Sequence, residues 1–469
     1  MSGLFSTLNI TVKALNAHGR ALETAGRNLS NVNNPAYSRQ RVIYGDRGTV
    51  ATPGGTESLG LEALGVQQFR DNLLDRQLMR EISLKSSFEA EQSAYQRAQA
   101  GLGQGISATG AAETNTAGSN GIGAAMDNFF NAFQNLASSP TDVGARQALM
   151  QTASVLTDRF QLVDTRLAQA QSDIDAQVST DVGSVNTLLS TIATLNGQIG
   201  RFEINAPGAS VDLRDQRQAK LEELAAKLPV ELTDTPSGQI QVSARDANGN
   251  EIKLIDLNQV TGPVVFDGTQ ILAGSPSIAL SLSSGSLKGQ LTARDGAVQT
   301  LRSNLDLLAR QLVTSVNSAY NPTGATGNFF APAGLTAGTI ALVPGLSANS
   351  LKASDGGAAG DNAVALAIAD IANRRFSTAS GDALDGTLGN FYSNSVSGLG
   401  QALSGANSRV EDQTNIEKLV RSQRDAVSGV SLDEEMADLM KYQRSFQASS
   451  RVFGVIDNLL DDVVNRLGR

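Results

Sequence analysis

Hydrophobic residues recur at strict seven-residue intervals along the last forty residues of the chain. The series is Leu432, Leu439, Phe446, Phe453, Leu460 and Leu467. A second series follows three places after members of the first; it consists of Tyr442, Ile456 and Val463, with Ser449 as a small polar interruption. Two such positions in every seven form the apolar seam of a coiled coil, so this stretch predicts one long amphipathic helix.

Polar residues mark the start of this helix. Ser431 stands three places before Glu434, which is the spacing of a capping box, and the acidic residues 433–435 suit the positive end of a helix. The sequence therefore predicts a helix that begins near Leu432. It assigns these acidic residues to helix capping rather than to acid–base catalysis.

A matching seam lies at the other end of the chain, where apolar residues are separated alternately by four and three places. Its members are Leu4, Leu8, Thr11, Leu15, His18, Leu22, Ala25 and Leu29. A stripe this narrow needs a covering surface in water, because each leucine contributes roughly 1.5 to 3 kcal/mol only when it is buried. We therefore predict that a first helix, residues 6–31, pairs with the last one as a coiled coil.

The flank that this pairing leaves uncovered is predicted to contact further copies of the same chain. The residues assigned to this axial packing are Leu8, Leu15, Leu22, Leu29, Leu432, Leu439, Phe446, Phe453, Leu460 and Leu467.

The segments between the two seams are mostly helical in pattern. After Pro35, which disfavours helix at the preceding residue, residues 37–47 are expected to be irregular or extended and residues 50–60 to form a loop. Helical patterns follow at 67–99 and at 125–202, with a break near 138–141. About sixty helical residues at 1.5 Å each would form a rod on the order of 90 Å long.

The period changes after a short helix predicted for residues 213–228. Apolar and polar residues then alternate, and Asn248 and Gly249 supply a hairpin turn. The predicted fold class is therefore mainly α with a β-rich insertion. It comprises paired terminal segments (1–60 and 430–469), a helical middle domain (61–229, 293–320 and 361–429), a small outer β domain (230–292) and an outer Gly/Pro-rich excursion (321–360).

Composition narrows the class of protein. Of 469 residues 41% are hydrophobic, which indicates a folded chain, but only 4% are aromatic, which indicates thin helical cores. A net charge of −9 without a basic cluster argues against binding nucleic acid or an anionic membrane surface. The longest apolar run, 363–369, is too short to span a bilayer, and the N-terminus lacks the apolar core of a signal peptide. Any export is expected to proceed without a cleaved signal.

Candidate chemistry is sparse. The single histidine, His18, lies in the N-terminal seam, where a packed structural role is expected, and the absence of cysteine removes thiolate metal sites and Cys/His pairs. The glycine run 101–105 follows a helix rather than a strand, so it does not predict a dinucleotide loop. We predict no enzymatic activity, no catalytic or metal-binding residue and no cofactor.

The end of the first helix and the turn after it carry Ala25, Asn28, Asn33, Tyr37, Arg39 and Gln40. In type and order these residues resemble the N-terminal signature of bacterial flagellar axial proteins, which are the rod, hook and hook-associated subunits. Arg27 stands where that family has asparagine, and Ala36 stands where it has glycine, a difference that bears on the local backbone angle. We expect Tyr37 and Arg39, which lie outside the helix, to bridge to a neighbouring subunit.

Three further segments, 145–149, 213–217 and 428–435, are similar to the hook-associated subunits that join hook and filament. This resemblance extends to about residue 320 and includes both termini, but not residues 321–360. It implies terminal helices in an inner ring, export by the flagellar type III apparatus and an extracellular position at the hook–filament junction, with a role in flagellum assembly and motility. The implied partners are copies of the chain in a ring, the hook protein, a second junction protein on the filament side and an export chaperone at the C-terminal region.

Two alternatives stay open on the sequence. A flagellar hook or rod subunit is disfavoured because such subunits lack the long helical block 145–202. An intracellular coiled-coil scaffold protein would also explain the seams, but it leaves the β insertion without a role.

Overall fold

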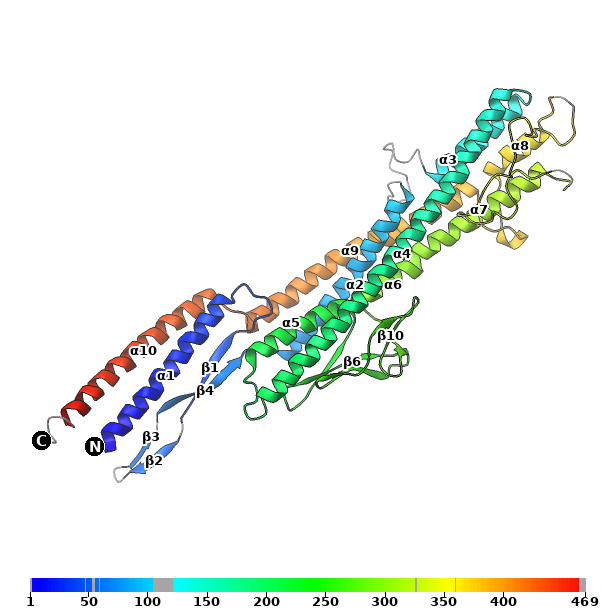
Figure 1. Ribbon diagram of the computed structural model, residues 1–469. Coiled ribbons are helices and arrows are strands. Elements are labelled where there is room, and N and C mark those ends of the chain that lie inside the picture. Colours follow the sequence, from blue (N-terminus) through cyan, green and yellow to red (C-terminus); the bar gives the residue numbers. More distant parts are fainter. Residues whose placement is uncertain are drawn as a thin grey trace.

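The computed structural model describes residues 2–46, 48–52, 55–58, 60–103, 121–324, 327–358 and 360–463. The molecule is a long rod with both chain ends at one tip (Figure 1). Helix α1 (Ser2–Ser30) lies antiparallel against α10 (Leu432–Asp461) at that tip. The predicted mainly α fold with paired terminal helices is therefore confirmed.

A long β-hairpin follows α1, and the sequence did not predict it. Strand β1 (Gln40–Asp46) pairs antiparallel with β4 (Leu61–Gln68), with a bulge between Ile43 and Tyr44. Strands β2 (Thr49–Thr52) and β3 (Gly55–Ser58) pair with each other farther along the hairpin. The expected loop at 50–60 is wrong because two strands of loop-like composition satisfy each other's backbone groups, and α1 supports the longer pair on one side.

The middle of the rod is a helical bundle. It contains α2 (Asn72–Leu102), α3 (Ile122–Ser138), α4 (Val143–Phe202), α5 (Val211–Lys227), α6 (Gly285–Ala293), α7 (Gln299–Tyr320) and α9 (Leu388–Ser428). A π-helical turn, Arg294–Val298, joins α6 to α7. Helix α4 has 60 residues, which at 1.5 Å each gives a length of about 90 Å. The break before α4 lies where the sequence predicts it, and the Asp142 side chain accepts a hydrogen bond from the Gly144 amide there.

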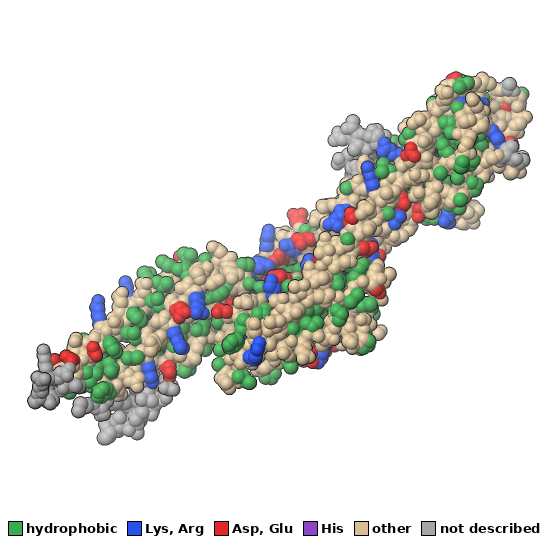
Figure 2. Space-filling model, in the orientation of Figure 1, with side chains coloured by type: hydrophobic (Ala, Val, Ile, Leu, Met, Phe, Trp, Pro, Cys, Tyr) green, Lys and Arg blue, Asp and Glu red, His purple; other side chains and the backbone are tan. Residues whose placement is uncertain are grey.

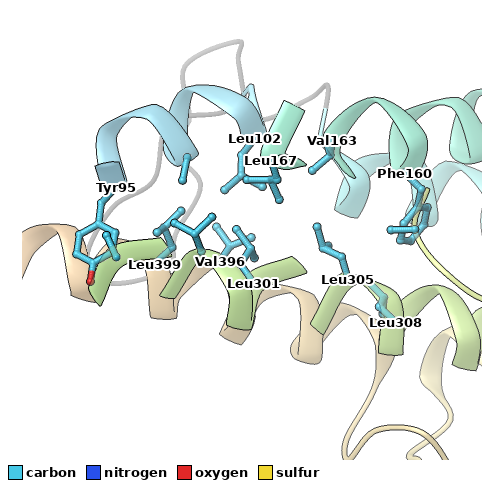
Figure 3. Packing of buried hydrophobic residues seen from close by; sticks show 14 of the residues in the cluster. Tyr95, Leu102, Phe160, Val163, Leu167, Leu301, Leu305, Leu308, Val396 and Leu399 are labelled. Atoms are coloured by element: carbon cyan, nitrogen blue, oxygen red, sulfur yellow. The ribbon is translucent and has the colours of Figure 1, made fainter. Parts of the chain in front are cut away.

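One continuous hydrophobic core holds these helices together (Figure 3). In the close-up, side chains from four helices meet, and each helix contributes residues spaced by three, four or seven places. Those labelled are Tyr95 and Leu102 on α2, Phe160, Val163 and Leu167 on α4, Leu301, Leu305 and Leu308 on α7, and Val396 and Leu399 on α9. The thin, leucine-rich core matches the low aromatic content.

The β-rich insertion lies beside α4 and α5 (Figure 1). Its larger sheet has the order β5-β6-β7-β8, formed by Glu231–Asp234, Ile240–Arg245, Glu251–Asp256 and Gln259–Val260. Its smaller sheet has the order β11-β10-β9, formed by Ile278–Ala279, Ile271–Ala273 and Val265–Phe266. The β6–β7 hairpin turns at Gly249, whose φ of 83° requires glycine in practice, as the Asn-Gly pair predicts.

The segment expected to project outward, 321–360, is instead packed onto the tip of the rod opposite the chain ends. Phe329 and Phe330 are fully buried and meet Phe129, Phe133 and Tyr320 with ring centroids 5.5 to 5.9 Å apart. Helix α8 (Ala363–Asp370) follows and packs against α3 and α7. Because the segment is rich in glycine and proline, its two phenylalanines were not predicted to be buried, yet they supply a large apolar surface to this tip.

Candidate functional site

The seam of α10 lies against α1 in the predicted register. Leu439, Phe446, Phe453 and Leu460 are half-buried there, and Ile456 is buried. Phe446 sits opposite Gly19, since a Cβ built on that glycine would lie 3.8 Å from the Phe446 ring. One member of the predicted series, Leu432, does not contribute, since it is 52% exposed on the first turn. Leu467 lies outside the described residues.

Helix α1 buries more than its predicted seam. Leu8, Leu15, Leu22 and Leu29 are half-buried, as is His18. The most buried positions are small or polar: two of them, Thr11 and Ala25, belong to the predicted seam, and the others, Ala17, Ala21, Thr24 and Asn28, do not. The reason is that α1 contacts strands β1 and β4 as well as α10, so small side chains fill the narrow space beneath the hairpin.

His18 is a packed side chain. Its Nδ1 is buried without a partner among the described residues, and burial lowers the pKa of its imidazole. Because the neutral form is favoured there, His18 carries no charge into the seam at neutral pH.

The turn after α1 is organised around Asn28, which is 2% exposed. Its Nδ2 donates to the Gln40 carbonyl at 2.8 Å and to Glu435 Oε2 at 3.0 Å, while its Oδ1 accepts from Tyr37 Oη at 2.8 Å and from the Gln40 amide at 3.0 Å. This one amide therefore joins the end of α1, the turn, the start of β1 and the start of α10. Its polar atoms are all bonded, as a buried amide requires.

Arg39 joins the same turn to the first turn of α10. Its Nε donates to Glu435 Oε1 at 2.7 Å and its Nη1 to Glu434 Oε2 at 2.6 Å, and its backbone amide donates to the Ser428 carbonyl at 2.8 Å. The predicted capping box is therefore wrong: Ser431 makes no side-chain capping bond, and Glu434 turns toward Arg39 instead. Charge pairing across the chain replaces the local cap.

Tyr37 and Arg39 are thus engaged within the chain. Tyr37 links the turn to Asn28 at the end of α1, and Arg39 links it to the start of α10. A bridge from these residues to a second subunit stays a prediction. Asn33, another residue of the predicted signature, is exposed on the turn. Together with Ala25 and Asn28, the signature residues hold the junction where the terminal helix pair meets the middle bundle.

Two further arginines, one just before α2 and one on α9, donate hydrogen bonds to carbonyl groups of the turn. Arg424 Nη2 donates to the Pro35 carbonyl at 2.7 Å, and Arg70 Nη2 donates to the Ala36 carbonyl at 3.3 Å. Ala36 is absent from the positive-φ residues of the described chain, of which Leu257 is the only one that is not glycine. Alanine therefore fits the backbone at this position without strain.

Asp215 on α5 completes the junction. Its Oδ1 accepts from Arg70 Nη2 at 2.7 Å and from Gln68 Nε2 at 2.8 Å. Burial nevertheless raises the pKa of Asp215 to about 7, because the cost of removing the carboxylate from water exceeds the attraction of Arg70. The sequence showed residues 213–217 only as a subfamily signature, and their place in this junction depends on tertiary contacts.

Pairing of α1 and α10 leaves two apolar flanks on α10. The first flank is Leu432, Met436 and Met440; the second is Val452, Val455 and Leu459. Met440 follows the seam residue Leu439 by one place and Met436 lies one turn before Met440, whereas the members of the second flank each precede a seam residue. Since successive helical residues are about 100° apart, the two flanks point to opposite sides of the pair. Figure 2 shows hydrophobic side chains gathered along this tip of the molecule.

The described residues contain no group of three His, Asp or Glu side chains placed to hold a metal ion. No helix within those residues combines the length and the apolar character needed to cross a membrane.

Comparison with known proteins gives matches in two regions of the chain. The model of the flagellar hook-associated protein FlgK helical domain matches residues 113–330, and that of the flagellar basal body rod FlgEFG protein C-terminal region matches residues 421–467. The first therefore covers α3 to α7 with the β insertion, and the second covers the end of α9 and α10.

Individual relatives match over most of the chain. Flagellar hook-associated protein 1 of Bacillus subtilis is 26% identical over all of this chain and 99% of its own length. The protein of that name from Salmonella typhimurium is 24% identical over 98% of this chain and 99% of its own length. A solved structure, described as the flagellar hook junction protein FlgK from Burkholderia pseudomallei, aligns at 21% identity with a TM-score of 0.46, over 55% of this chain and 46% of that one.

The helical rod with paired ends and the two regional matches define a bacterial flagellar axial protein. Within that class, the full-length relatives identify the chain as a member of the flagellar hook-associated protein 1 family. This is a family of structural flagellar proteins rather than of enzymes.

Proposed function

We propose that this chain is a structural subunit of the flagellum that joins hook to filament, and that its copies assemble side by side into a ring through the terminal helix pair. The observation that carries the proposal is the presence of two exposed apolar flanks on opposite sides of α10. A ring needs two different surfaces on each subunit, one for each neighbour, because its contacts are heterologous.

The size of the flanks supports a contact that forms only on assembly. Val455 is 60% exposed, and the other members of both flanks are 44 to 53% exposed. Because these side chains are about half exposed, covering each one contributes half of the roughly 1.5 to 3 kcal/mol that a fully exposed side chain would give. Apolar rows of this kind are uncommon on a soluble monomer unless they serve a contact.

The remaining partners follow from the family resemblance. The hook protein and a second junction protein would contact the ring from below and above, and an export chaperone would cover the C-terminal region before assembly. The apolar flanks of α10 suit such a chaperone, since they stay exposed to water until the ring forms. Export without a cleaved signal peptide belongs to the same proposal.

Complementation of a deletion strain tests this function. Cells that lack the gene are expected to keep hooks, to shed filament protein into the medium and to lose motility. The variant Val455→Asp should leave the monomer folded, because the side chain is exposed, but should restore neither filaments nor swimming. A buried carboxylate between subunits is costly when no cation pairs with it.

The matched control is Asn458→Asp, which adds the same charge on the same helix turn, away from both flanks and the seam. This variant should restore motility. Normal filaments from Val455→Asp would contradict the ring contact, and normal filaments in the deletion strain would contradict the junction role altogether.

A further inference from the structure

A cleft of about 370 Å³ lies between α2, α5 and the β insertion. Four arginines line it: Arg70 and Arg76 from the α2 side, and Arg214 and Arg217 from α5. Gly238, with a φ of 76°, forms part of the wall, and a Cβ there would collide with Glu203 and Arg214. Two carboxylates, those of Asp75 and Asp234, also line the cleft.

Three of the four arginines have carboxylate partners. Arg70 pairs with Asp75 and Asp215 at 3.2 and 2.7 Å, and Arg76 pairs with Asp234 at 2.7 Å. Arg214 pairs with the buried Glu203 at 2.5 Å. These pairs fix the guanidinium groups around the cleft.

Arg217 differs from the other three. It is only 7% exposed, yet no carboxylate of the described residues lies within 4.0 Å of its guanidinium. Its Nη1 donates to Asn196 Oδ1 at 2.8 Å and to the Gly238 carbonyl at 2.9 Å, and both of these acceptors are neutral. The guanidinium is therefore held in place by neutral groups while it faces an open cleft.

The electrostatic setting favours an anion at this point. Burial is the first cause that lowers the pKa of Arg217 to about 10, and the neighbouring positive charge of Arg214 is the second. An unpaired buried cation is costly, and a guanidinium forms its strongest bonds with planar carboxylate or phosphate oxygens.

We propose that this cleft is a binding site for an oxyanion, a carboxylate or phosphate group, which pairs with Arg217 inside the cleft and with Arg76 at its rim. The group comes either from a small free anion or from an acidic side chain of a neighbouring subunit. No residue of α10 lines the cleft, so binding of an anion there is separate from the proposed ring contact.

Binding is measured on the purified full chain by calorimetry and by thermal unfolding, with inorganic phosphate as one probe and an N-acetylated glutamate amide as the other. Sodium chloride at equal ionic strength is the reference, because non-specific screening would act equally in both salts. The variants are Arg217→Gln and Arg76→Gln, with Arg201→Gln as the matched control. Arg201 is an exposed arginine at the end of α4 that does not line the cleft.

Saturable binding of either probe is expected, with at least about tenfold weaker binding by Arg217→Gln and unchanged binding by Arg201→Gln. Binding of phosphate points to a free anion, and binding of the blocked glutamate alone points to a side chain of a neighbour. If Arg217→Gln does not fold, the binding affinity of Arg76→Gln tests the proposal. The Arg76 side chain is partly exposed, so its replacement leaves the core intact. Absence of binding by both probes, or wild-type affinity in the folded cleft variants, would overturn the proposal.

Discussion

The side-chain amide of Asn28 donates a hydrogen bond of 3.0 Å to the carboxylate of Glu435, which lies 407 residues later in the chain. The two residues stand at the end of α1 and the beginning of α10, so this bond fixes the register of the terminal pair at its inner end. Both side chains are 2% exposed. The joint between the paired helices and the rod is therefore a buried polar contact rather than a loose hinge.

Replacement of Asn28 by alanine should loosen this joint. The change leaves the Tyr37 hydroxyl, the Gln40 backbone and Glu435 without their shared partner, which should lower the local stability of the terminal pair by roughly 2 to 4 kcal/mol. Amide hydrogen exchange within α1 measures this quantity directly. The control is Asn33→Ala, an exposed residue of the same turn, which should change exchange by no more than about 0.5 kcal/mol. Equal exchange in the two variants would contradict the role given to Asn28.

Replacement of Ala36 by glycine tests whether alanine is strained where the family has glycine. Ala36 does not have a positive φ, so glycine relieves nothing and adds freedom to the unfolded chain. The variant should therefore lose about 0.4 to 1 kcal/mol of stability, measured by the same hydrogen exchange in α1 and β1. A gain in stability would show that the backbone at residue 36 favours glycine after all.

Asp215 should give the molecule a measurable dependence on pH. Its pKa is raised from 3.8 to about 7 in the folded state, so between these values the folded chain holds a proton that the unfolded chain has lost. The contribution of Asp215 to stability is therefore complete below about pH 4 and is lost as pH rises through 7.

The variant Asp215→Asn removes this titration. The difference in unfolding free energy between wild type and variant, measured by urea unfolding from pH 4 to pH 8, should shift in favour of the variant by on the order of a few kcal/mol. Other carboxylates titrate equally in both proteins and cancel in the difference. A constant difference across this range would show that Asp215 titrates as an ordinary carboxyl.

The sequence predicted best where the pattern was long and periodic. Helices α4 and α10 carry repeats over many turns, and such repeats specify both the helix and the face that is buried. The pairing of the chain ends followed from two narrow seams that each needed a cover. The hairpin formed by β1 to β4 escaped prediction because Thr49–Thr52 and Gly55–Ser58 have the composition of a loop, and the support that α1 gives to β1 and β4 is visible only in the folded chain.

Side-chain partners were harder to predict than helices. Asn28 and Arg39 were recognised as signature residues, but nothing local shows that both meet Glu435. The acidic residues at the start of α10 fit the pattern of a helix cap, so the sequence provided no reason to expect Arg39 as their partner. Likewise, residues 213–217 read as one helical segment, and only the folded chain separates Asp215, at the junction, from Arg217, in the cleft.

Labelling of single cysteines tests the central claim most directly, since the chain has no native cysteine. Leu459→Cys places a thiol on the second flank of α10, and Asn248→Cys places one on the exposed hairpin turn of the β insertion. Both thiols should react readily with a maleimide in the purified monomer. In intact flagella the thiol at position 459 should become at least about tenfold less reactive, because a neighbouring copy covers the flank, while the thiol at position 248 should react as before. Equal reactivity at position 459 in monomer and flagella would contradict the assembly of these subunits through their terminal helices.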